Sequence, residues 1–220
     1  MKRIITVLFL FLCYSSPAQK FYAGAGLEFS NQSSGAWITD SLALATTNTF
    51  GRKYIIPHMG MNFSINEKVS AQAEVAYRRH TISLQYWNNR ADTCRLCPVK
   101  KGGGPGIDEF RFAGRLNYRV MNLIPCIFLT AGVTANIPFN VQGNASILPE
   151  DYQALAIAAE GIRTGSYAYE LGIMIQYKFL QFSILSTHNP AYTRSFEFMD
   201  EKIPFRTSER MWQYRLSLQF

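Results

Sequence analysis

The sequence predicts an all-β protein: an eight-stranded antiparallel up-and-down transmembrane β-barrel with a short helix in its third long loop. Eight segments alternate apolar and polar residues with the period of two that is typical of strands. Long and short connections alternate along the chain, as expected when hairpins place all long loops on one side of a membrane. The apolar face of each segment is almost free of charge at its centre, where Arg or Lys in a membrane barrel costs roughly 2–4 kcal/mol.

Residues 1–18 are predicted to be a signal peptide, which leaves residues 19–220 as one barrel domain. Lys2 and Arg3 form a basic start, residues 4–14 are apolar, and small residues lead up to Ala18. Beyond this segment no apolar run approaches the roughly 18–20 residues of a spanning helix, so a helical membrane protein is excluded. The formal net charge of +7 favours anionic lipid headgroups over nucleic acid as partners of an exported chain.

Four strands are expected in the first half of the chain: residues 21–30, residues 54–65, a segment from Val69 to the region of His80, and residues 109–120. Pro57 has no N–H for a strand ladder, so it predicts a bulge or a local gap in pairing. The apolar parity flips near His80, which predicts a β-bulge or the end of the membrane-embedded part. The polar segments 31–52 and 87–108 are expected to be long loops.

The second half supplies four more strands, at residues 127–137, 166–178, 180–184 and 209–220. Residues 138–165 form the third long loop, in which Pro149, neighbouring acidic residues and Gly161 predict a short helix. In the fourth loop, residues 195–198 are expected to pair with residues 203–206 as an extension of the last hairpin. Residues 66–68 and the region around Lys178 are tight turns.

The cysteines leave several chemistries open. Cys94 and Cys97 form a C-x-x-C segment, which is compatible with a loop disulfide, a redox pair or half of a metal site. No second C-x-x-C and no nearby histidine accompany them, so a disulfide in an oxidising compartment is favoured. Cys126 is then left without a partner. We expect no metal and no cofactor.

Charged residues recur on the strand face opposite the apolar one. An eight-stranded barrel is just wide enough to be filled by side chains, and buried charges must pair. We therefore predict an interior charge network, and a filled structural interior is favoured over an ion path. Glu74 is expected to pair with Arg115, and Glu28 with Arg215. Its members are Glu28, Glu74, Arg78, Arg111, Arg115, Arg119, Glu170 and Arg215.

The last strand alternates strictly between apolar and polar residues, and the chain stops on it. The face is made by Trp212, Tyr214, Leu216, Leu218 and Phe220. With the Ala18-Gln19 end of the signal segment, this resembles the small outer-membrane β-barrel family of Bacteroidota, which includes PorT-like and OmpA-type eight-stranded barrel domains.

The resemblance implies an outer-membrane location with both termini in the periplasm. It also implies recognition of the last strand by the barrel-assembly machinery. The expected partners are outer-membrane lipid and lipopolysaccharide, and other envelope or secretion proteins.

Three functions stay open from the sequence. The favoured one is a non-enzymatic structural, surface-binding or secretion-assembly role. The second is a lipid-modifying enzyme of the lipid A deacylase or acyltransferase type, which needs a histidine beside a serine and an acid. His80 and Ser83 do not match the His-x-Ser spacing of the deacylases, and His58 lies on the inner face. The third is a soluble secreted β-barrel.

Overall fold

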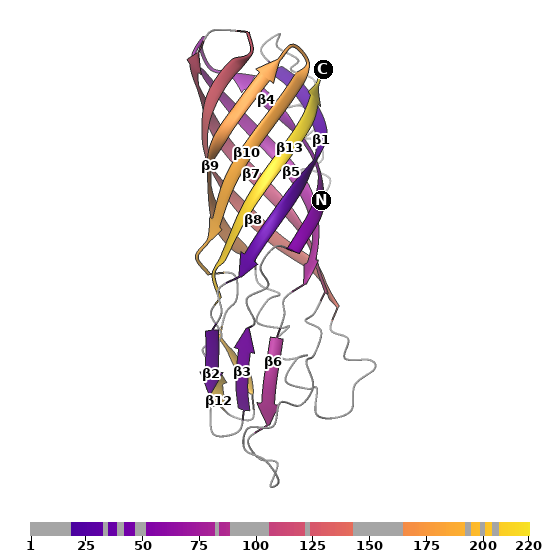
Figure 1. Ribbon diagram of the computed structural model, residues 1–220, viewed down its shortest axis with the longest axis vertical. Helices are drawn as coiled ribbons and strands as arrows, with labels where there is room; N and C mark the ends of the chain where they lie inside the picture. Colours follow the sequence, from indigo (N-terminus) through magenta and orange to yellow (C-terminus); the bar gives the residue numbers. More distant parts are fainter. Residues whose placement is uncertain are drawn as a thin grey trace, which may run out of the picture.

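The computed structural model describes residues 19–32, 35–38, 42–46, 52–81, 84–88, 106–121, 124–142, 165–191, 195–198, 201–203 and 207–220. Eight long strands within these residues close into one antiparallel barrel, in which β13 pairs with β1 (Figure 1). The barrel strands are β1 (Gln19–Gln32), β4 (Arg52–Ser64), β5 (Val69–Thr81), β7 (Gly106–Met121), β8 (Cys126–Gln142), β9 (Ser166–Tyr177), β10 (Leu180–Asn189) and β13 (Glu209–Gln219).

The predicted fold class is confirmed. The expected helix, the signal segment and the Cys94–Cys97 pair lie outside the described residues. Within the described part of the chain, no helix is long and apolar enough to cross a membrane.

The barrel is apolar outside and polar inside. On β13, Trp212 and Leu216 are 53% and 56% exposed, whereas Gln213 and Arg215 between them are 1% and 2% exposed. A closed barrel satisfies its backbone groups within the sheet, and an outward apolar band matches a hydrocarbon solvent. The polarity is the reverse of that in a soluble barrel, so the soluble alternative does not hold and the barrel spans a membrane.

The two ends of the barrel differ in their connections. At one end, which we call the turn end, only Lys178 and Phe179 separate β9 from β10, and residues 65–68 separate β4 from β5. Lys178 has a φ of 51°, the left-handed conformation that two-residue hairpin turns require. Tyr22 pairs with Gln219, so both ends of the barrel domain lie there as well. The opposite end, which we call the loop end, carries the long connections.

Two small sheets lie beyond the loop end (Figure 1). One has three strands in the order β2 (Gly35–Ile38), β3 (Leu42–Thr46) and β6 (Leu84–Asn88). The other pairs β11 (Phe196–Phe198) with β12 (Glu201–Ile203). The expectation of plain loop was wrong for residues 35–38, 42–46 and 87–88. Strands of four or five residues that pair across a distance in the chain leave little periodic signal.

The hairpin expected in the fourth loop exists, but its second segment was misplaced. Phe196 pairs with Ile203 and Phe198 with Glu201, so the second strand is 201–203 rather than 203–206. Residues 204–206 lie outside the described part of the chain. Pro204, with no N–H to donate to a ladder, is a poor continuation of a strand.

Pro57 marks a gap in the barrel wall, as its chemistry predicts. The ladder between β4 and β5 runs from Ser64↔Ser70 to His58↔Ala76 and ends one residue before Pro57. The loop-end part of β4, residues 52–57, pairs with β1. Because Pro57 lacks the donor that a ladder needs, the local gap in pairing is confirmed.

The parity flip near His80 is a strand end rather than a bulge. β5 pairs with β7 without a shift as far as Thr81, and the next strand, β6, belongs to another sheet. The shift at this end lies between β7 and β8, where Glu109 pairs with Pro138. A proline is tolerated at such an irregularity, so β8 continues to Gln142 and does not end at residue 137 as expected.

Candidate functional site

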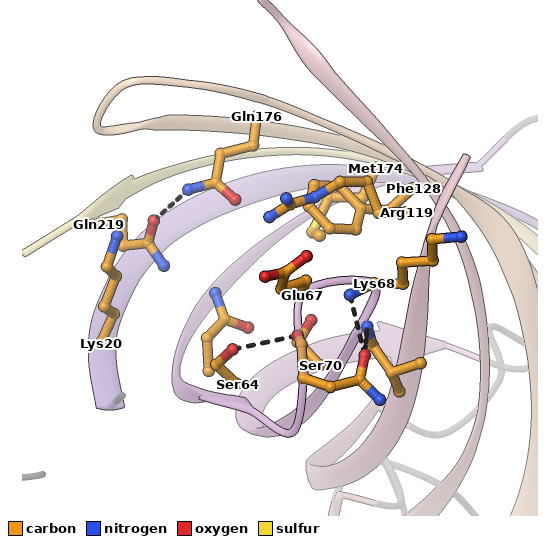
Figure 2. Close-up of a pocket in the computed structure, with 13 residues that line it drawn as sticks. Lys20, Ser64, Glu67, Lys68, Ser70, Arg119, Phe128, Met174, Gln176 and Gln219 are labelled. Carbon is orange, nitrogen blue, oxygen red and sulfur yellow. Dashed lines mark hydrogen bonds between the residues drawn. The ribbon is translucent and has the colours of Figure 1, made fainter. Parts of the chain in front are cut away.

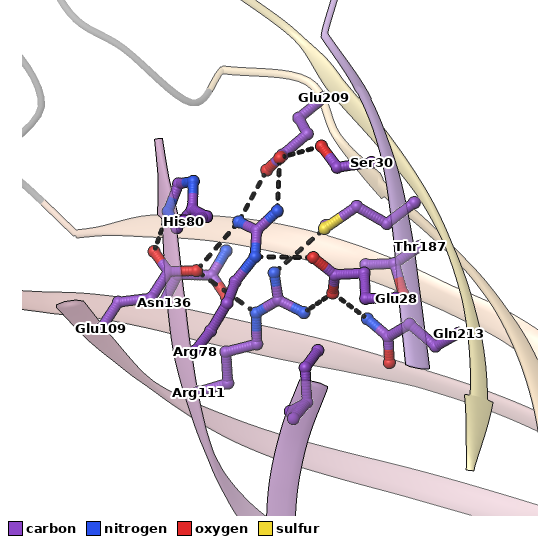
Figure 3. A network of polar contacts seen from close by, with 12 residues as sticks. Glu28, Ser30, Arg78, His80, Glu109, Arg111, Asn136, Thr187, Glu209 and Gln213 are labelled. Carbon is purple, nitrogen blue, oxygen red and sulfur yellow. Dashed lines mark hydrogen bonds and ion pairs between the residues drawn. The ribbon is translucent and has the colours of Figure 1, made fainter. Parts of the chain in front are cut away.

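The interior of the barrel holds a cluster of five buried charges near the loop end, which we call the loop-side cluster. Arg78 is fully buried, and its guanidinium contacts three carboxylates. Its Nε lies 2.6 Å from Glu28, its Nη1 3.1 Å from Glu109 and its Nη2 2.6 Å from Glu209. Arg111 contacts Glu28 and lies 3.4 Å from Glu109. These side chains come from four strands and meet in the lumen (Figure 3).

Polar side chains complete this cluster. Ser30 donates a hydrogen bond of 2.6 Å to Glu209, and Gln213 donates one of 3.1 Å to Glu28. The Nε2 of His80 lies 3.6 Å from Glu109. The carboxylates therefore have neutral donors as well as arginines, which buried charges need if they are to stay ionised in a low dielectric.

A second group of four charges, the turn-side cluster, lies closer to the turn end. Arg115 makes two contacts of 3.0 Å with Glu74, and its Nε lies 2.6 Å from Glu170. Arg215 also contacts Glu74, and Tyr22 donates a hydrogen bond of 3.1 Å to the same carboxylate. Two arginines and two glutamates balance one another. The pair Glu74–Arg115 that the strand parity predicts is formed.

Gln213 connects the two clusters. Its amide nitrogen donates to Glu28 in the loop-side cluster, and its amide oxygen accepts from Arg215 in the turn-side cluster. The expected contact between Glu28 and Arg215 was wrong. Arg215 lies opposite Gly26 in the β1–β13 ladder, and Glu28 lies opposite Gln213. Among the described contacts, Glu28 instead meets arginines that reach across the lumen from β5 and β7.

The network therefore bridges opposite walls of the barrel. Arg78 on β5 contacts Glu209 on β13, and Arg215 on β13 contacts Glu74 on β5, although β1 and β4 separate these strands in the sheet. In an eight-stranded barrel such cross-lumen contacts fill the available width. Chemically, the arrangement holds charge in ion pairs that cross the lumen.

The membership of the interior network differs from the prediction at three residues. Arg119, predicted as part of the network, lies at the turn end with its guanidinium 5.4 Å from the centre of the Phe128 ring. Glu109 and Glu209 were missed as network members, although both are fully buried at the loop end. Their signal was present, since each sits on the same strand parity as Arg111 or Arg215, but at a predicted strand end.

The histidines lie in three different environments. The Nε2 of His58 is 2.8 Å from the hydroxyl of Ser217, and its Nδ1 is 3.4 Å from the carbonyl of Ile56. His80 belongs to the loop-side cluster. His188 lies opposite Arg210 in the backbone ladder between β10 and β13. Ser83 lies outside the described residues. No group of three or more His, Cys, Asp or Glu side chains in the described segments has the geometry of a metal site.

The outer surface carries aromatic side chains near both ends. At the loop end, the rings of Phe110 and Phe139 are stacked with centres 4.8 Å apart, and Tyr77 lies 6.2 Å from Phe110. At the turn end, Tyr118 and Phe220 are 50% and 74% exposed. Two aromatic bands of this kind are expected where a membrane meets water.

The apolar face of the last strand lies within this outer surface. Its five members are each at least 41% exposed: Trp212, Tyr214, Leu216, Leu218 and Phe220. Two arginines interrupt the apolar parity, Arg79 on β5 and Arg210 at the start of β13, and both are exposed at the loop end. Arg79 lies 3.7 Å from Asp108. Long cationic side chains at this level reach the headgroup region.

Comparison with known proteins yields likeness in fold alone. No protein-family model matches the chain, and no curated protein matches it in sequence. Neisserial surface protein A (NspA) is 11% identical, with 91% of this chain and 97% of that chain covered and a TM-score of 0.45. Ail, the attachment invasion locus protein of Yersinia pestis, is 9% identical, with 91% and 98% covered and a TM-score of 0.42. The outer membrane protease OmpT of Escherichia coli is 6% identical, with 91% and 96% covered and a TM-score of 0.47.

Proposed function

We propose that this chain is an integral outer-membrane protein with both termini in the periplasm and a non-enzymatic role. In this role the barrel is a closed scaffold, and the segments at the loop end bind a partner or take part in secretion assembly, as in PorT-like proteins. The observation that carries the proposal is the interior network, whose ion pairs cross the lumen between β5 and β13. A lumen crossed by ion pairs favours display of the loop end over transport through the barrel.

The small sheets support the display role. β2, β3 and β6 come from two separate connections, yet they form one sheet beyond the loop end of the barrel. A folded extension of this kind offers a surface with a defined shape, which costs less entropy on binding than an unstructured loop. The sheet lies beyond the barrel end opposite the ends of the barrel domain, which is the cell surface in the proposed orientation (Figure 1).

Replacement of residues 33–51 and 82–105 by short turns tests this role. The shortened barrel is expected to reach the outer membrane and to keep the heat-dependent gel mobility of a folded barrel. It is also expected to lose the envelope proteins that co-purify with the parent. The matched control replaces residues 66–68 at the turn end with another tight turn. This control barrel is expected to retain the co-purifying envelope proteins. An unchanged set of co-purified proteins after loop replacement would refute the proposal.

A lipid-modifying enzyme is the second candidate, and one contact favours it. His58 and Ser217 are in hydrogen-bond contact at 2.8 Å, as a base and a nucleophile would be. Both side chains are buried in the lumen, and Nδ1 of His58 faces a backbone carbonyl rather than a carboxylate. Mass spectrometry of lipid A from cells with His58→Ala or Ser217→Ala separates the candidates. We expect an unchanged profile; a changed acylation pattern in both variants would establish the enzyme.

A further inference from the structure

The turn end of the barrel opens into a cavity that the charge network does not use. Its volume is about 480 Å³, which is within the range of small-molecule pockets. The walls come from every barrel strand except β10, together with the tight turn at residues 65–68. Figure 2 shows the polar side chains of this turn-end pocket gathered around its mouth.

Two cations and one acidic residue give the pocket a net positive charge. Lys20 and Arg119 line it, the side chain of Lys68 at its edge points away from the cavity (Figure 2), and Glu67 is the one acidic residue among the described lining residues. The guanidinium of Arg119 lies over the Phe128 ring at 5.4 Å from its centre and points into the cavity from β7 (Figure 2). The backbone N–H of Arg119 donates a bond of 2.7 Å to the carbonyl of Lys68. Both contacts fix Arg119 before any ligand arrives.

The floor of the pocket is apolar, and its wall opposite Arg119 carries amide side chains. Phe128 and Met174 are buried beneath the cations and close the cavity toward the barrel interior. On the wall opposite Arg119, Gln176 donates a hydrogen bond of 2.6 Å to the side-chain oxygen of Gln219. That bond directs the amide nitrogen of Gln219 toward the cavity (Figure 2). An entering molecule therefore meets donors at the rim and apolar atoms below.

We propose that the turn-end pocket binds a carboxylate ligand with a small apolar body. Arg119 and Lys20 hold the carboxylate from opposite sides of the mouth, and Gln219 donates a further hydrogen bond. The apolar body rests on Phe128 and Met174. A guanidinium that is fixed in advance forms strong charge-assisted hydrogen bonds with a carboxylate. The source is either a free dicarboxylate or an acidic side chain of a peptide that reaches the turn end.

Calorimetry on the detergent-solubilised full chain tests the proposal with two probes. Glutarate represents the free dicarboxylate, and a blocked tripeptide of aspartate, phenylalanine and aspartate represents the peptide. The tighter probe identifies the source, and the asparagine analogue of the tripeptide is expected not to bind. Binding is expected to weaken as salt rises, because exposed charges are screened. Failure of both probes to bind at millimolar concentration would overturn the proposal.

Variants locate the bound carboxylate. Arg119→Gln and Lys20→Gln are each expected to weaken binding by about tenfold, the loss of one charge-assisted contact. Glu67→Gln is expected to strengthen binding, since it removes the opposing charge. Lys178→Gln is the matched control, because Lys178 lies at the same end of the barrel outside the pocket lining. Equal affinity in all four variants, or an equal loss in the control, would overturn the assignment.

Discussion

Replacement of Arg78 by methionine is expected to lower the free energy of unfolding by about 3–5 kcal/mol, the cost of breaking a buried ion pair. Arg78 contacts three carboxylates and is fully buried. Without it, Glu28 and Glu109 keep their contacts with Arg111, but Glu209 keeps only the hydroxyl of Ser30 in direct contact, with Arg111 and His80 acting on it from farther away. Most of the loss therefore comes from Glu209, a buried carboxylate that no longer contacts an opposite charge.

Urea unfolding of the barrel in lipid vesicles, followed by tryptophan fluorescence, measures this loss. The double variant Arg78→Met with Glu209→Gln is expected to be more stable than Arg78→Met alone, since it removes the uncompensated charge. Arg210→Met is the matched control, because Arg210 is an exposed arginine at the same end, and it is expected to change stability by no more than about 0.5 kcal/mol. An Arg78→Met barrel as stable as the control would refute the network's role.

Three further predictions concern the barrel wall. Leu171→Arg, at a 65% exposed position in the middle of β9, is expected to cost about 2–4 kcal/mol in vesicles, and a neutral result would mean that this face does not meet lipid. Gly24→Ala is expected to lower the urea midpoint because a Cβ there would overlap the carbonyl oxygen of Leu216, whereas Gly114→Ala meets nothing within 4 Å and is expected to be tolerated. The reverse order would contradict the β1–β13 packing. Phe220→Ala is expected to slow assembly into the outer membrane in cells while the purified barrel keeps its stability, and unaltered assembly kinetics would exclude it as a recognition signal.

Alternation along the chain was enough to predict which face of each strand is inside. Trp212 and Leu216 point to lipid and Arg215 to the lumen because successive side chains of a strand lie on opposite faces. The same rule placed Glu74 and Arg115 in the lumen, on two strands that also follow one another in the chain. For that pair, parity and an equal count from the turn-side ends of two neighbouring barrel strands were sufficient to predict the contact.

The alternation along one strand carries no information about its register with the neighbouring strand. The wrong pairing of Glu28 with Arg215 follows from that. Strands of a barrel are tilted and staggered, so the neighbourhood of two strands does not say which of their residues lie side by side. Glu28 and Arg215 were matched only because closure makes their strands neighbours, but the ladder sets Glu28 opposite Gln213. The connecting role of Gln213 was also missed, because a neutral amide has no charge to mark it as part of an ion-pair network.

The non-local contacts were the least accessible to sequence reasoning. Arg78 meets Glu209 across the lumen, and β3 meets β6 beyond the loop end; both contacts join segments that are distant in the chain. No local pattern specifies such a pair, because its geometry depends on closure of the whole barrel. Pro57 is the opposite case, in which the missing N–H of one residue predicted a gap in pairing that the β4–β5 ladder displays.

Conductance of the purified chain in planar lipid bilayers tests the central claim most directly. The ion pairs between β5 and β13 cross the lumen, so the intact barrel is expected to show no stepwise opening above the background of the bilayer. Insertion is verified in the same preparation by protease protection of the barrel strands. A reproducible open state with ohmic conductance in the inserted, unmodified barrel would contradict a closed scaffold.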